Sequence, residues 1–230
     1  MKYKFITVNK EIIKINLFDA DDSITVTEPD NIIAFQSEHS YLREDYIFDE
    51  IKITYKRKTK IKGPSTTFIK SSSQSSIRIL KINQDNQFIF NLNILFYTKD
   101  IKVNISLEDM KHIPFKNNMF RYECCGIGEV GYYAEGDLIE IDLEENETIF
   151  INPNNVLGYT KDISYEMRTY GNDTAALKMD YHYKFIGKGK ILIQTQSMDS
   201  DITQVINNKS DNFIKRTLKE FIPFLNIVWK

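Results

Sequence analysis

Apolar and polar residues alternate along most of the chain with a period of two, the pattern of strands with one buried face. Between 138 and 143, for example, Ile139, Ile141 and Leu143 alternate with residues of the opposite face. The acidic stretch 142–147 is typical of a polar turn. Asn-Pro-Asn-Asn at 152–155 adds a proline that fixes φ and asparagines that tolerate a left-handed conformation. The pattern therefore predicts β-strands joined by short turns.

One segment of this pattern occurs twice. Phe88–Ile101 reads FIFNLNILFYTKDI, and Phe150–Ile163 reads FINPNNVLGYTKDI, so that Phe88 falls on Phe150 without a gap up to the last residue. Amphipathic strands resemble one another in their apolar positions, but that resemblance does not explain a shared Tyr-Thr-Lys-Asp-Ile. The coincidence indicates an internal repeat, which decides the fold of a chain more than any local signal.

A shift back by the same interval reaches a third segment. There Ile33 falls on Leu95, and Phe35 falls on Tyr97. The sequence therefore predicts three tandem β repeats of about 62 residues within one domain. The domain would span residues 1–209. Its three repeats would span about 1–62, 63–124 and 125–200.

The predicted fold class is all-β, with the repeats stacked about a pseudo-threefold arrangement. A single unit of about 60 residues exposes its sheet edges, and stacked units can pair them. Two glycine pairs, Gly126-Ile127-Gly128 and Gly187-Lys188-Gly189, recur at nearly the interval of the repeat. Such pairs can cradle phosphate when they open a helix, but strand-like sequence follows both of these. A bulge or a close backbone approach is the preferred interpretation.

The last residues of the chain have a different period. In 210–230, apolar residues that include Phe213, Leu218 and Phe221 fall on one face at helical spacing, and Pro223 ends the pattern. This pattern predicts one C-terminal helix. The helix can cover the open end of the β domain, or dock on a partner or a membrane surface, so these three residues are a candidate partner surface.

Composition restricts the functional classes. Lys and Arg number 30 against 32 Asp and Glu, so the net charge of −2 gives no global attraction to nucleic acid or anionic membrane. The two cysteines, Cys124 and Cys125, are adjacent, which favours two free thiols in a reducing compartment. The first residues lack the apolar core of a signal peptide. We expect a soluble, cytoplasmic protein.

A stretch in the second half resembles a known family. The pieces are GIGEVGYYAEG, an acidic turn, the strand after Asn-Pro-Asn-Asn, and KFIGKGKILIQTQS, and together they span about 120–196. They resemble the altered inheritance of mitochondria protein 24 (mitochondrial biogenesis) family. The resemblance implies a fold like the tryptophan RNA-binding attenuation protein, a relative of the double-stranded β-helix. It implies no established activity, and mitochondrial relatives are linked to inner-membrane organisation.

No catalytic or metal-binding constellation is evident. A metal site on such a fold needs two histidines at close spacing, whereas His39, His112 and His182 are far apart in sequence. Cys124 or Cys125 with His182 could form a nucleophilic pair, but a buried structural cysteine is the preferred interpretation. We predict a non-enzyme without cofactors.

A lysine-rich segment keeps one alternative open. Lys56, Lys58 and Lys60 would share one face of a strand, as a stripe that follows phosphates or as the charged face of an edge strand. The edge or solvated face is preferred. The sequence favours a non-catalytic scaffold or binding protein, with a protein partner or self-association, a membrane surface as a further partner, and nucleic acid disfavoured. An RNA- or small-ligand-binding regulator is the alternative.

Overall fold

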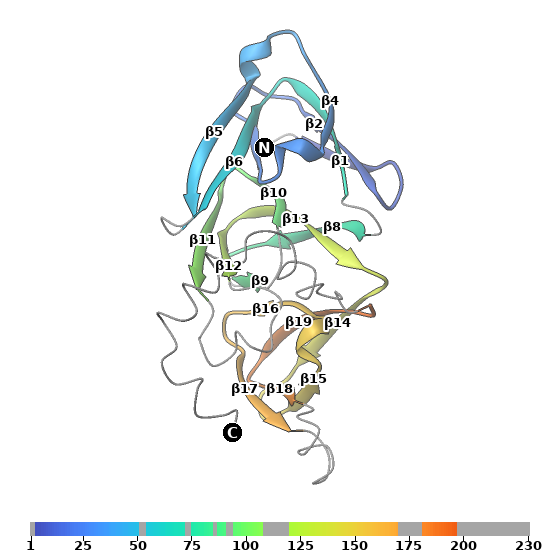
Figure 1. Cartoon of the computed structure of the whole chain (residues 1–230), viewed down its shortest axis with the longest axis vertical. Helices are drawn as coiled ribbons and strands as arrows, with labels where there is room; N and C mark the ends of the chain where they lie inside the picture. The colour runs from blue at the N-terminus through green and yellow to red at the C-terminus, as the bar shows by residue number, and fades with distance from the viewer. Residues whose placement is uncertain are drawn as a thin grey trace, which may run out of the picture. The chain divides into compact units, whose positions relative to one another are not determined.

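The computed structural model describes residues 3–50, 54–71, 75–84, 87–90, 94–107, 120–169 and 181–196. Antiparallel strands dominate these residues, so the predicted all-β class is confirmed. Residues 1–197 form one compact unit, and the strands described in it make four sheets (Figure 1). The helix predicted at 210–230 lies outside the described residues.

After the first strand, β1 (Tyr3–Thr7), the described strands fall into three successive sets of six. Set 1 comprises β2 (Ile12–Leu17), β3 (Ser23–Val26), β4 (Ile32–Ser37), β5 (Arg43–Glu50), β6 (Thr54–Lys62) and β7 (Ser65–Lys70). Set 2 comprises β8 (Ser75–Ile82), β9 (Phe88–Phe90), β10 (Ile94–Thr98), β11 (Ile101–Leu107), β12 (Phe120–Gly126) and β13 (Gly128–Glu135). Set 3 comprises β14 (Leu138–Leu143), β15 (Thr148–Ile151), β16 (Val156–Thr160), β17 (Ser164–Thr169), β18 (Tyr181–Ile186) and β19 (Gly189–Gln194).

The same pairing occurs in each set. One half of a set has three strands in the order β2-β7-β4, β8-β13-β10 or β14-β19-β16. The other half has the order β5-β6-β3, β11-β12-β9 or β17-β18-β15. A register shift interrupts the first half at one equivalent point, between Ile32 and Ala34 in set 1 and between Val156 and Gly158 in set 3. Set 2 has the same shift between Ile94 and Phe96.

The two middle sheets are shared between sets. Sheet A (β1-β2-β7-β4) contains a half of set 1, and sheet D (β15-β18-β17) contains a half of set 3. Sheet B (β5-β6-β3-β10-β13-β8) joins the other half of set 1 to a half of set 2 through β3 and β10. Sheet C (β11-β12-β9-β16-β19-β14) joins set 2 to set 3 in the same way, through β9 and β16.

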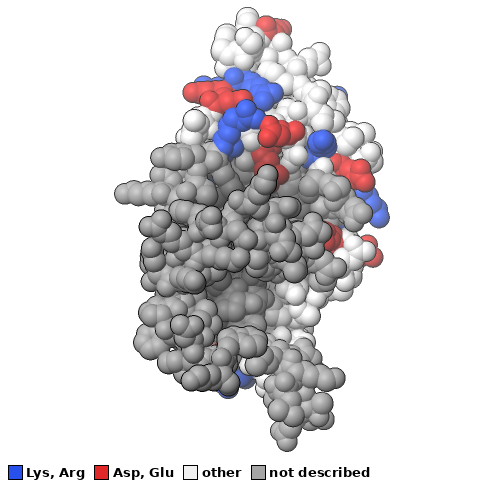
Figure 2. Space-filling model, viewed as in Figure 1, with Lys and Arg blue, Asp and Glu red and all other residues white. Residues whose placement is uncertain are grey.

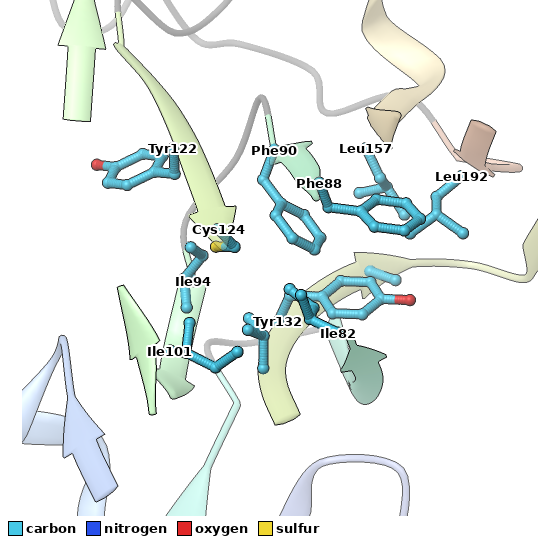
Figure 3. Close-up of a cluster of buried hydrophobic side chains, with 12 residues drawn as sticks. Ile82, Phe88, Phe90, Ile94, Ile101, Tyr122, Cys124, Tyr132, Leu157 and Leu192 are labelled. Carbon is cyan, nitrogen blue, oxygen red and sulfur yellow. The ribbon is translucent and has the colours of Figure 1, made fainter. Parts of the chain in front are cut away.

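Apolar side chains fill the space between successive sheets. The first core lies between sheets A and B and includes Ile15, Val26 and Phe96. The second core, between sheets B and C, is shown in Figure 3, and the third core, between sheets C and D, includes Tyr183. Alternate residues of a middle strand therefore point into different cores, which is what period-two alternation with apolar residues on both faces produces.

The predicted turns are present. Residues 144–147 connect β14 to β15, and Asn146 adopts a positive φ of 74°. Pro153–Asn155 form a 3-10 turn, η4, in which the Asn152 side-chain oxygen accepts a hydrogen bond from the backbone N–H of Asn154 at 3.0 Å. Turns are therefore present at both predicted segments, but the left-handed φ expected for the asparagines of 152–155 occurs instead at Asn146.

Candidate functional site: the turns that join the sets

The repeated Thr-Lys-Asp-Ile segment forms the turn that carries the chain from one sheet to the next. Thr98 ends β10 in sheet B, and Ile101 begins β11 in sheet C. The Thr98 Oγ1 atom accepts a hydrogen bond from the backbone N–H of Glu129 at 3.0 Å. In set 3, the Thr160 Oγ1 atom accepts the equivalent bond from Lys190 at 3.0 Å. The threonine therefore ties this turn to the start of β13 or β19.

The glycine pairs form the second crossing of each set and contact the first. Gly126 ends β12 in sheet C, and Gly128 begins β13 in sheet B. A Cβ atom on Gly126 would lie 2.1 Å from the Asp100 carbonyl oxygen, and one on Gly128 would lie 2.1 Å from Thr98 Oγ1. Gly126 also has a φ of +119°, which favours glycine. The predicted close backbone approach is confirmed.

Set 3 repeats this contact. A Cβ atom on Gly189 would lie 2.0 Å from Thr160 Oγ1, and one on Gly187 would lie 2.9 Å from the Asp162 carbonyl oxygen. The two glycines have φ values of +156° and +117°. The recurrence of two sequence motifs thus reflects one structural unit, in which two sheet crossings pack against each other.

The lysine of each motif reaches back to the preceding set. The Lys99 ammonium donates a hydrogen bond to the Asp21 carbonyl oxygen at 2.7 Å. The Lys161 ammonium lies 2.5 Å from the Glu123 carboxylate. The backbone N–H groups of the same two lysines donate to the carbonyl oxygens of Ser23 and Gln87, at 3.1 and 2.8 Å. Each motif therefore fastens its set to the one before it.

The turn after β4 in set 1 does not have the Thr-Lys-Asp motif. The residues equivalent to Thr98-Lys99-Asp100 are Gln36-Ser37-Glu38. The crossing from β6 to β7 uses Gly63, and a Cβ atom there would meet the Asp19 carbonyl oxygen at 2.3 Å instead of a residue after β4. Among the described sets, the motif follows β10 and β16, which pair with strands of the set before them, and it does not follow β4.

The lysine strand does not form the edge that the sequence predicts. β6 lies between β5 and β3, because Arg43–Glu50 pairs with residues 54–61 of this strand. Lys60 lies opposite Glu44 in this register, and Lys58 lies opposite Tyr46. The prediction of an edge strand is therefore wrong. The sequence of β5 has too many charged residues to be identified as a strand from alternation, yet β5 covers this edge of β6.

Lys58 is buried, with 5% of its surface exposed, and its ammonium lies 5.8 Å from the centre of the Tyr97 ring. A cation over an aromatic face is attracted by the ring quadrupole. Lys60 is half-buried, while the side chain of Lys56 is outside the described residues. Figure 2 shows acidic and basic residues side by side on the visible face of the described part. Lys58 and Lys60 therefore do not form a continuous cationic stripe on the surface.

The adjacent thiols are both free, as predicted, and they differ in environment. Cys124 is fully buried in the second core, where Figure 3 shows it beside Ile94. Burial raises the pKa of the Cys124 thiol well above its ordinary value. Cys125 is half-buried, and its thiol lies 3.7 Å from the Lys102 carbonyl oxygen. Because the thiolate is the nucleophile, the environment of Cys124 opposes nucleophilic chemistry.

The carboxylates near Gly189 are matched by lysines. A surface hollow of about 430 Å³ there is lined by acidic and basic residues. The Lys190 ammonium lies 3.0 Å from Asp142 and 3.4 Å from Glu140, and the pKa of Lys190 is raised by these partners. The equivalent residue in set 2, Glu129, has a pKa raised chiefly by burial. Within the described ranges, no three His, Cys, Asp or Glu residues are placed to hold a metal ion.

Two of the histidines belong to separate parts of the unit. His39 precedes the short helix η2 (Ser40–Leu42) and stacks on Tyr41 with ring centres 5.0 Å apart. His182 lies on β18 in sheet D. His112 lies outside the described residues, as do Phe213, Leu218 and Phe221 of the predicted partner surface.

The family can now be stated, because a family model matches more than half of the chain. The family model described as Mitochondrial biogenesis AIM24 matches residues 44–196. The chain belongs to this family. A comparison with curated proteins gives no match.

A solved structure has a similar fold. Protein SPYM3_0169 from Streptococcus pyogenes, solved by X-ray crystallography, is 11% identical with a TM-score of 0.65. The similarity covers 90% of this chain and 98% of that chain. At this identity the similarity shows the fold alone.

The AIM24 match contains both Thr-Lys-Asp-Ile turns and both glycine pairs, whereas β3, with which β10 pairs, lies before the matched residues. The predicted family is confirmed, while the predicted likeness to the tryptophan RNA-binding attenuation protein stays a prediction. Among the helical segments that the structure describes, none has the length and apolar character needed to cross a membrane. The sequence analysis used the Thr-Lys-Asp-Ile repeat as evidence for architecture. It did not predict that the threonine and lysine of this repeat connect neighbouring crossings and sets.

Proposed function

We propose that this AIM24-family chain is a non-catalytic β scaffold that works by binding or assembly. The observation that carries the proposal is the sharing of sheets B and C between successive sets. Each set contributes three strands to a sheet that its neighbour completes. The chain therefore already uses strand pairing as its means of joining folded units, which is a device suited to assembly.

The chemistry of the junctions supports this assignment. Thr98 and Thr160 use their hydroxyl groups on backbone N–H groups of the next crossing. Gly126 and Gly187 are required by close contact with backbone carbonyl groups. These recurrent residues thus stabilise the connection between sets, and their conformations are explained without a substrate.

The alternative of an RNA-binding regulator has weaker support. Binding along a phosphate backbone needs cations that are free to face it. Lys58 is buried over the Tyr97 ring, and Lys60 lies opposite Glu44. At least Lys58 of this basic segment therefore contributes to the packing of the fold and does not face outward toward a phosphate backbone.

Native mass spectrometry of the full chain, together with elemental analysis, tests the scaffold proposal. We expect masses that correspond to the protein alone or to multiples of it, and no metal in stoichiometric amount. A discrete additional mass on each chain would instead identify a small-ligand-binding protein and favour the regulator over the scaffold. Salt-dependent retention of RNA that is lost in a Lys60→Glu variant would favour the alternative.

A further inference from the structure

The face of sheet A that points away from the first core carries lysines and apolar residues. In β2 and β7 the odd-numbered residues are buried, and Ile15 and Ile69 among them belong to the first core. Because side chains alternate along a strand, the even-numbered residues point to the opposite face. Along β1, β2 and β7, this outer face includes the charged residues Lys4, Lys14 and Lys70 and no Asp or Glu.

These three lysines, the lysine row, follow one diagonal across neighbouring strands. Lys4 of β1 lies opposite Asn16 of β2, and Lys14 is the next residue of β2 on the same face. Lys14 lies opposite Phe68 of β7, and Lys70 is the next residue of β7 on that face. Diagonal neighbours of this kind are about 7–8 Å apart, so three positive charges gather on a small part of the sheet.

The lysine row has no ion-pair partner among the described residues. Lys4 and Lys70 are exposed, whereas Lys14 is half-buried between Ile6 and Phe68, which lie opposite it on β1 and β7. The Lys14 ammonium lies 5.5 Å from the centre of the Phe68 ring, a contact that holds the charge over the face. Apolar neighbours reduce solvent screening, so an acidic group placed here is attracted more strongly than at an open surface.

Sheet D shows how an outer face is neutralised within the chain. Glu166 of β17 lies opposite Lys184 of β18, on the face that points away from the third core. The Arg168 guanidinium lies 3.0 Å from the Glu166 carboxylate, and the Lys184 ammonium lies 3.7 Å from it. The charges of sheet D therefore compensate one another, whereas the lysine row of sheet A stays positive.

The chain also presents an exposed acidic turn, residues 144–147, between β14 and β15. Its three glutamates, Glu144, Glu145 and Glu147, are all exposed. Hydrogen bonds order the turn, since the Glu144 N–H donates to the Glu147 carboxylate and the Glu147 N–H donates to the Glu144 carbonyl oxygen, both at 3.0 Å. The Lys188 ammonium is 3.8 Å from Glu144, whose side chain is still 67% exposed. An ordered turn with three carboxylates complements a face with three lysines.

We propose that the acidic turn of one copy docks on the lysine row of a second copy. This inference rests on the proposed scaffold function and names its partner. The acidic turn connects sheet C to sheet D, and sheet B with the first and second cores lies between these sheets and sheet A. The turn therefore cannot reach the lysine row of its own chain.

A narrow acidic turn fits the lysine row better than an anionic membrane does. Glu11 precedes β2 and Glu38 follows β4, so both lie beside sheet A, and both are exposed. A planar anionic surface that covered the whole face would also meet these two carboxylates, which it repels. A turn of four residues can contact the three lysines alone.

The chemistry of this contact determines how it behaves. The acidic turn and the lysine row are different surfaces, so the contact is heterologous and extends to a closed ring or a filament. Ion pairs near the surface contribute little each and are screened by salt. Association should therefore depend on concentration, reverse on dilution and weaken as the ionic strength rises.

Charge reversal on each surface, followed by mixing, tests the contact. The face variant carries Lys14→Glu and Lys70→Glu, and the turn variant carries Glu144→Lys and Glu145→Lys. Sedimentation velocity of the full-length chains at low ionic strength measures the dissociation constants. Each variant alone should associate at least about tenfold more weakly than wild type, because like charges then face each other. An equimolar mixture should regain association, since the reversed face of one variant meets the reversed turn of the other.

A matched control makes the same change of charge elsewhere on the surface. Lys102→Glu with Lys161→Glu reverses two exposed lysines outside sheet A and should leave association as in wild type. A wild-type chain that stays monomeric, a face or turn variant that associates as wild type does, or a mixture that regains no association would overturn the proposal. Equal weakening in the control would also overturn it, because net charge alone would then explain the result.

Vesicles that contain phosphatidylserine test the membrane surface as the other occupant. We expect none of the chains to co-sediment with them. Co-sedimentation of wild type and the turn variant but not of the face variant, without self-association of wild type, would overturn the proposal in favour of a membrane surface.

The two proposals fail separately in these experiments. A monomer with no additional mass in native mass spectrometry would overturn the contact between the acidic turn and the lysine row and leave the scaffold function standing. A ligand mass on every chain would favour the regulator over the scaffold whatever the mixing experiment shows.

Discussion

The crossing after β4 and the crossings after β10 and β16 follow equivalent strands but are built differently. After β10 and β16, a threonine, a lysine and an aspartate carbonyl all make contacts with another crossing or with the preceding set. After β4, the chain has Gln36-Ser37-Glu38 and proceeds through the short helix η2. The difference shows that the residues shared by the two Thr-Lys-Asp-Ile segments are needed for the junction between sets and not for the strands themselves.

The comparison also separates two contributions to the fold. All three sets have the same halves and the same register shift, so hydrophobic alternation and turn chemistry suffice for those features. The Thr-Lys-Asp-Ile turn and the glycine pair are additional, and they occur together. Variants that disturb them should therefore affect sets 2 and 3 and have little effect at the equivalent position of set 1.

The largest effect is expected for Gly126→Ala. The added Cβ atom would lie 2.1 Å from the Asp100 carbonyl oxygen, and the φ of +119° is unfavourable for any L side chain. Backbone strain of this kind together with a clash destabilises by at least about 2 kcal/mol. Urea unfolding of the variant measures this loss. The neighbouring Ile127→Ala, at an exposed position, is the control, and equal stability of the two variants would contradict the assigned contact.

Thr98→Val is expected to have the next largest effect. Valine keeps the shape of threonine but cannot accept the hydrogen bond from the Glu129 N–H group. Loss of one partner of a buried hydrogen bond costs about 1–3 kcal/mol. The matched control is Gln36→Val, at the equivalent position of set 1, which should change stability by less than about 0.5 kcal/mol as surface substitutions do. Similar losses in the two variants would remove the distinction between the crossings.

Much of the fold follows from the sequence because its signals are local. Alternation predicted the strands, Asn152 and Pro153 predicted the turn before β16, and the glycine pairs predicted a close approach that Gly126 and Gly128 confirm. Each of these signals acts within a few residues, where steric limits on φ and side-chain hydrogen bonding decide the conformation.

The parts that the sequence did not reveal depend on distant partners. From the sequence alone, the lysine segment resembles an edge strand. Its neighbour Arg43–Glu50 contains too many charged residues to be recognised as a strand from alternation. The burial of Lys58 likewise depends on Tyr97 of the following set. The register of β3 with β10 determines which residues of sets 1 and 2 are in contact. A local sequence pattern does not contain this register.

The pH dependence of stability distinguishes the two fastened junctions. Burial raises the folded-state pKa of Glu129, whose side chain is 14% exposed, whereas its counterpart Lys190 is held by Asp142 and Glu140. A carboxyl group with a raised pKa favours folding most below its unfolded pKa, and this contribution is lost as the pH rises through the folded value. Glu129→Gln should therefore gain stability relative to wild type as the pH rises above the unfolded Glu pKa of about 4.3 and through the raised folded value. A difference in unfolding free energy that does not change with pH would contradict this account.

The smallest effect concerns the two lysines of the repeated motif, and salt separates them. Lys161 lies 2.5 Å from the Glu123 carboxylate, whereas the Lys99 ammonium donates to the carbonyl oxygen of Asp21. Salt screens an exposed ion pair more than a hydrogen bond to a neutral carbonyl group. Lys161→Met should therefore lower the melting temperature slightly at low ionic strength and have almost no effect in concentrated NaCl. Lys99→Met should cause a loss that changes little with salt. Identical salt dependence of the two variants would show that the fastener works through the backbone and threonine contacts alone, because those contacts are the ones that both junctions share.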